Sequence, residues 1–113
     1  SLSSAPVWSP AEAFPEGVNV EFVRQVGRTH VQMRVFERGV GETLSCGTGT
    51  VAVAAVMARR TGDLGPWRVD VPGGRITVEL AQSQNGEVLA SLTGPAVLVA
   101  QGEVHIPDEA VSR

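Results

Sequence analysis

The feature that most constrains the fold is an apolar segment that follows a glycine-rich stretch. Residues 39–50 contain four glycines and lead into VAVAAVMARR (51–60), which is apolar at nearly every position before its two arginines. Its alanines favour helix, and Gly62 stands where a C-terminal cap is expected. We therefore predict a helix over about 47–60. Because this helix has no polar face, it is expected to be buried on all sides.

Strand-like segments flank the predicted helix. Two of them precede it, alternate apolar with polar side chains, and are joined by a short turn at Gly27-Arg28, which predicts an antiparallel hairpin. Four more follow, separated by turns rich in proline, glycine and asparagine. The expected strands are 18–24, 31–36, 67–71, 75–80, 87–92 and 96–104. The predicted fold class is α/β of the α+β type, with mostly antiparallel strands rolled around one central buried helix.

Length and charge limit the classes of function that this chain can have. The 113 residues suit one domain, and we expect a Ser/Pro-rich linker or tail over 1–16, a folded unit over 17–105 and a tail over 106–113. Nine arginines against twelve acidic residues give a net charge of −3, which argues against nucleic acid as a partner. No apolar run is long enough for a membrane span, and the first residues lack a signal-peptide pattern. A cytoplasmic protein is predicted.

The single cysteine is the candidate reactive group. Cys46 precedes Gly47-Thr48-Gly49 and the predicted helix, where backbone N–H groups without helical partners favour a thiolate. The glycines let such N–H groups approach an anion, for example a carboxylate. The alternative is a small buried cysteine at a tight turn. One cysteine and two distant histidines make no local metal motif, so no metal is expected.

A longer string identifies a family resemblance. FERGVGETLSCGTG (36–49) closely resembles the second catalytic signature of the diaminopimelate epimerase family, which works without a cofactor. GVNVEFV (17–23), VPGG (71–74) and LTGPA (92–96) resemble further blocks of that family, in the same order. The resemblance covers about residues 14–104. It implies conversion of LL- to meso-diaminopimelate, a step toward lysine and cell-wall precursors, by an isomerase that uses two thiols as acid and base.

The resemblance also assigns roles to residues. Cys46 would be one of the two acid/base cysteines, and Glu37 would tune the thiol as well as bind substrate. The residues expected to bind diaminopimelate are Asn19, Glu37, Arg38, Gly47 and Thr48. Each has a plainer interpretation, since Asn19 could be a turn residue at a strand start, Glu37 and Arg38 an exposed pair, and Thr48 a helix cap.

The chain departs from the family in one respect that matters for activity. The family needs two cysteines, and its Cys-Gly-Asn-Gly and Gly-Asn-Pro-His blocks do not occur here. The resemblance therefore implies the C-terminal half of a two-half enzyme, with an N-terminal half carrying the second cysteine as partner. These residues alone are expected to be inactive, and a homodimer is left open. The alternatives are another PLP-independent racemase of the same superfamily, or a non-catalytic domain that binds a small carboxylate.

Overall fold

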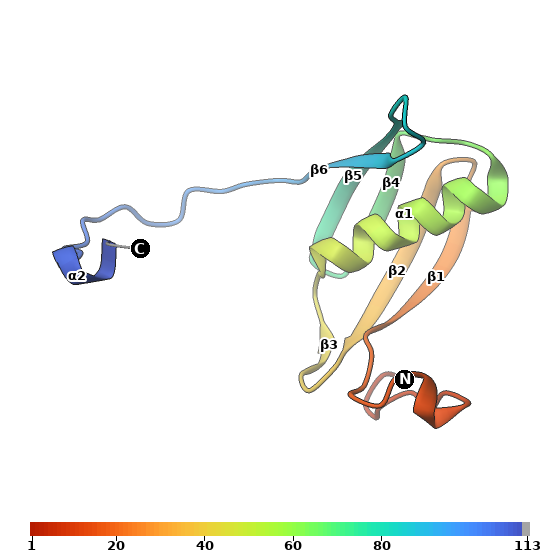
Figure 1. The fold of residues 1–113 in the computed structure, drawn as a ribbon, viewed down its shortest axis with the longest axis horizontal. Coiled ribbons are helices and arrows are strands. Elements are labelled where there is room, and N and C mark those ends of the chain that lie inside the picture. Colours follow the sequence, from red (N-terminus) through yellow and green to blue (C-terminus); the bar gives the residue numbers. More distant parts are fainter. Residues whose placement is uncertain (112–113) are drawn as a thin grey trace.

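The computed structural model describes residues 1–111 and has an α+β architecture, with a mixed sheet covered on one face by the helix α1, Gly47–Thr61 (Figure 1). The strand order is β1-β2-β4-β5-β6, and β3 pairs with β2 beside this path. All pairings are antiparallel except that of β2 with β4, which is parallel. The connection from β2 to β4 contains α1. The strands are β1 Val20–Gly27, β2 His30–Glu37, β3 Gly41–Thr43, β4 Trp67–Val71, β5 Gly74–Gln82 and β6 Val88–Thr93.

The core lies between α1 and the sheet. Alternate residues of each central strand point toward the helix, as the two-residue period of a strand requires. Trp67 is wholly buried, and its indole Nε1 donates a hydrogen bond to the Asp63 carbonyl oxygen at 2.9 Å. The buried apolar residues are Val31, Met33, Val35, Val53, Ala54, Met57, Ala58, Trp67, Val69, Ile76, Val78 and Leu80.

The structure confirms the predicted helix and its cap. The helix ends at Thr61 and is capped by Gly62, whose φ of 78° is left-handed and whose N–H donates to the Ala58 carbonyl oxygen at 2.8 Å. Glycine adopts this conformation without the steric cost that other residues incur. Within residues 1–111 no helix is both long and apolar enough to cross a membrane.

The prediction that the helix is buried on all sides was wrong for this chain. The sheet covers one side of α1, while Val56 on another side is 57% exposed and Val51 is only half-buried. An apolar helix surface of this kind predicts burial. Here, however, no described residues lie over that side of the helix. The arrangement of strands fully rolled around the helix is therefore not seen in this chain.

The predicted strand over 96–104 was also wrong. This segment extends away from the sheet (Figure 1), and Val97, Leu98 and Val99 are 79%, 84% and 89% exposed. A strand needs a neighbour for its N–H and C=O groups, and the described chain offers none here. Of the predicted tail 106–113, Asp108–Val111 form the short helix α2, and 112–113 lie outside the described residues.

Two features of the sheet escaped prediction. Residues 41–43 form β3, which was not among the expected strands, so three strands precede α1 instead of two. Gly39 and Gly41, in the turn from β2 to β3, have positive φ values of 75° and 102°, which glycine adopts more easily than other residues. The parallel pairing of β2 with β4 was not predicted either.

Candidate functional site

Cys46 stands immediately before α1, in the segment that follows β3, and β3 pairs with the last residues of β2. Its backbone is extended, with φ −139° and ψ 110°, and its side chain forms no capping hydrogen bond. The Cys46 carbonyl oxygen accepts hydrogen bonds from Thr50 N at 2.9 Å and Thr50 Oγ1 at 2.8 Å. The backbone of the cysteine is thereby fixed. Its half-buried side chain packs against the edge of the core, and its Sγ lies 3.6 Å from the Thr48 hydroxyl oxygen.

The first turn of α1 offers backbone donors beside this thiol. Gly47 and Thr48 are exposed, and N–H groups at these helix positions have no partner within the helix. A Cβ atom at Gly49 would stand 2.5 Å from Glu21 Oε1, so glycine there lets the Glu21 carboxylate approach the first turn. The helix start thus exposes the backbone of Gly47 and Thr48, while the Glu21 carboxylate lies against Gly49.

A turn between β4 and β5 supports the segment that leads to Cys46. Gly73 N donates a hydrogen bond to the Leu44 carbonyl oxygen at 2.9 Å. A Cβ atom at Gly73 would stand 3.1 Å from that same oxygen, closer than backbone atoms ordinarily allow. The close approach of two backbone segments therefore depends on glycine at this turn.

Glu37 is the last residue of β2 and is half-buried. Strand alternation places its side chain on the same face of the sheet as Val35, which is the face that α1 covers. Thr43 lies opposite Val35 in the register of β2 and β3, and its Oγ1 donates a short hydrogen bond to Glu37 Oε2. The hairpin that joins these strands therefore fixes the Glu37 carboxylate.

Asn19 and Arg38 meet where β1 begins and β2 ends. Asn19 Oδ1 accepts a hydrogen bond from the Arg38 backbone N–H at 2.8 Å. The guanidinium Nη1 of Arg38 donates to the Glu16 carbonyl oxygen at 3.2 Å, and the side chain is otherwise exposed. The amide nitrogen of Asn19 and most guanidinium N–H groups remain available to a ligand.

The structure places all six predicted site residues at one end of the sheet, in separate groups. One group is Asn19 with Arg38, another is Cys46 with Gly47 and Thr48, and Glu37 is hydrogen-bonded to Thr43. Within residues 1–111 no hydrogen bond or ion pair joins the first group to Cys46. Sequence reasoning missed Thr43 and Glu21. The alternation over 18–24 sets Glu21 among the polar positions, whereas the structure places its carboxylate against Gly49 of α1.

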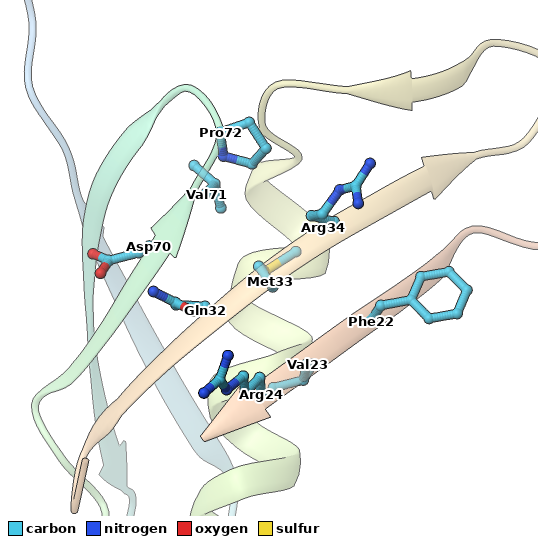
Figure 2. Close-up of a pocket in the computed structure, with 9 residues that line it drawn as sticks. All are labelled: Phe22, Val23, Arg24, Gln32, Met33, Arg34, Asp70, Val71 and Pro72. Atoms are coloured by element: carbon cyan, nitrogen blue, oxygen red, sulfur yellow. The ribbon is translucent and has the colours of Figure 1, made fainter. Parts of the chain in front are cut away.

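A hollow on the opposite face of the sheet is a separate feature. Figure 2 shows it over β1, β2 and β4, with Phe22, Arg24 and Arg34 on adjacent strands. Arg34 is engaged with the carboxylate of Glu42 at 2.5 and 2.7 Å. Arg75 and His30 both form hydrogen bonds with the carboxylate of Asp70. These bonds, with that of Arg75 the larger in effect, lower the pKa of Asp70 to about 2. Arg34 and Asp70 at the hollow are therefore already paired, and the hollow lies across the sheet from α1.

Hydrogen bonds to the ionised form keep Asp70 charged, so its contribution to stability is present above the pKa of an unfolded aspartate, about 3.9. That contribution is lost only as the pH falls toward 2. The network therefore adds to the stability of the fold at neutral pH, where Asp70 is ionised.

Comparison with known proteins gives consistent matches to one family. A family profile described as diaminopimelate epimerase matches residues 2–99. The chain is 51% identical to a diaminopimelate epimerase of Streptomyces coelicolor over 109 residues, which cover 90% of this chain and 36% of that protein. The enzymes of the same name from Thermobifida fusca and Paraburkholderia xenovorans are 50% and 43% identical, with 91% and 95% of this chain and 35% and 37% of those proteins covered. The chain spans about one third of the length of these relatives.

Proposed function

The chain belongs to the diaminopimelate epimerase family, and from this we propose that it forms one wall of an epimerase active site. The substrate would be diaminopimelate, and the reaction would invert one α-carbon of its LL-isomer to give the meso-isomer. The observation that carries the proposal is the place of Cys46, a free thiol at the exposed start of α1 in a chain half identical to such enzymes.

Proton transfer at the α-carbon requires a base on one face and an acid on the other. We assign one of these roles to Cys46, whose thiolate would remove the α-hydrogen as a proton and become a thiol. A second thiol, outside these 113 residues, would donate its proton to the opposite face. The free side chain of Cys46 supports this role, because a thiol engaged in capping would not be available to the substrate. No cofactor is needed for this step.

The substrate α-carboxylate would bind at the first turn of α1. The backbone N–H groups of Gly47 and Thr48 and the Thr48 hydroxyl lie next to the Cys46 thiol, which is 3.6 Å from that hydroxyl. Negative charge grows at the α-carbon and its carboxylate as the proton leaves. Donors at a helix start stabilise that charge, so binding and catalysis would use the same atoms.

The remaining polar groups would hold the rest of the substrate. Asn19 and Arg38 are linked through the Arg38 backbone, which leaves the guanidinium for a carboxylate. Glu37, which Thr43 orients, would bind an ammonium group of the substrate and tune the acidity of the Cys46 thiol. This set suits a molecule that bears both carboxylates and amines.

The exposed apolar side of α1 supports a role for sequence outside this chain. Val56 is 57% exposed, and the extended segment after β6 carries apolar residues without a partner. We propose that the N-terminal half of the protein supplies the second thiol and completes the rolled sheet around the helix. The active site would then lie in the cleft between the two halves.

The test is isotope exchange by the intact protein. LL-diaminopimelate incubated in deuterated water should yield the meso-isomer with deuterium at the inverted α-carbon, as followed by NMR and chiral chromatography. Exchange with a different amino acid alone would indicate another racemase. Binding of the substrate without any exchange would support a carboxylate-binding domain and overturn the proposal.

Arg38→Ala in the intact protein should weaken recognition. Loss of a charge-assisted contact corresponds to about a ten- to hundredfold fall in kcat/KM, and calorimetry should show weaker substrate binding. Arg24→Ala, on the opposite face of the sheet, is the matched control and should change neither quantity. Unchanged binding by Arg38→Ala would return Glu37 and Arg38 to the interpretation as an exposed pair.

A further inference from the structure

We propose that Thr43 is a positioning residue, which holds the Glu37 carboxylate in the orientation that the reaction uses. This inference rests on the proposed role of Glu37 in the epimerase site. Thr43 is the last residue of the short strand β3, and its Oγ1 donates a hydrogen bond to Glu37 Oε2. Three residues further along the chain lies Cys46, so one short segment carries both the orienting hydroxyl and the thiol.

Thr43 gives the only hydrogen bond that the Glu37 side chain makes within residues 1–111. No arginine is paired with Glu37, and the adjacent Arg38 donates instead to the Glu16 carbonyl oxygen. A glutamate side chain has three rotatable bonds, and one hydrogen bond restricts them here. Removal of the hydroxyl would therefore leave the carboxylate without a fixed direction.

Both ends of this hydrogen bond are held by the same hairpin. Val40 N donates to the Glu37 carbonyl oxygen at 3.2 Å, and β2 and β3 pair in register from Val35 with Thr43 to Glu37 with Gly41. The hydroxyl is thus placed by the backbone before any substrate arrives. Such preorganisation is what a group that acts on developing charge requires.

The experiment uses the intact protein with two replacements of Thr43. Thr43→Val keeps the shape and removes the hydroxyl, and kcat/KM for diaminopimelate should fall about ten- to a hundredfold. Thr43→Ser restores a hydroxyl and should recover activity to within a few-fold of the unmutated protein. Thr77→Val is the matched control, since Thr77 is a half-buried strand residue on β5 outside the site, and it should retain full activity.

A double-mutant cycle separates positioning from a structural role. In a Glu37→Ala background Thr43→Val should cost less than about twofold, because no carboxylate remains to be held. An equal loss in both backgrounds, or full activity of Thr43→Val, would overturn this proposal while the epimerase function stands. An unmutated protein that exchanges no α-hydrogen would overturn the proposed function itself.

Discussion

Replacement of Cys46 by alanine in the intact protein should remove most of the epimerisation, with a fall in kcat of about a hundred- to ten-thousandfold. The thiol is the proposed proton-transfer group, and such groups contribute about a hundred- to ten-thousandfold to catalysis. The side chain takes no part in capping α1, so its loss should leave the fold intact. The measurement is the rate of appearance of the meso-isomer from the LL-isomer.

Substrate binding should survive the same substitution. The proposed carboxylate site consists of the backbone N–H groups of Gly47 and Thr48, which alanine at position 46 does not remove. Calorimetry should therefore detect diaminopimelate binding to Cys46→Ala. Ser45→Ala, in the same loop, serves as control and should remain active. A Cys46→Ala protein that keeps more than a tenth of the activity would refute the assignment of the thiol.

The 113-residue chain by itself should show no epimerisation at concentrations where the intact protein is fully active. It contains one cysteine, and one thiol reaches only one face of the α-carbon. The assay compares the two proteins with pure LL-isomer in deuterated water. Addition of the remaining part of the protein, purified separately, should restore turnover. Appearance of the meso-isomer with the chain alone would show that a second acid or base lies within it.

The parts of the fold that depend on neighbouring residues were predictable. The helix 47–60 and its cap at Gly62 follow from alanine content and a glycine at the right position, and the structure has Gly47–Thr61. The hairpin at Gly27-Arg28 follows from turn residues between alternating segments, and the structure pairs β1 with β2 there. Local propensity and turn chemistry decide these elements.

The parts that depend on distant partners were not predictable. Residues 96–104 have the pattern of a strand, yet no strand forms because nothing in the described chain pairs with them. The parallel contact of β2 with β4 depends on how α1 crosses the sheet. The pattern of apolar and polar residues indicates whether a segment is able to form a strand. Whether a strand forms also depends on a neighbouring segment that pairs with it, and that segment is set by the fold of the whole molecule.

The same distinction applies to the site. Cys46 at the start of a helix could be predicted, because the glycines and the helix follow it directly in the sequence. The hydrogen bond from Arg38 N to Asn19 Oδ1 joins residues on two strands and depends on the register of β1 with β2. Thr43 was missed because it belongs to a strand of three residues, too short for alternation to indicate.

The uncovered side of α1 means that two mutational scans of this sequence would disagree. A scan that scores the stability of the 113 residues alone would treat Val56 and Val97 as surface positions, where polar residues cost little. In the proposed two-half arrangement, selection for function of the whole protein would keep both positions apolar, since the N-terminal half would then cover them. Consensus sequences would therefore misguide the design of a stable stand-alone version of this chain.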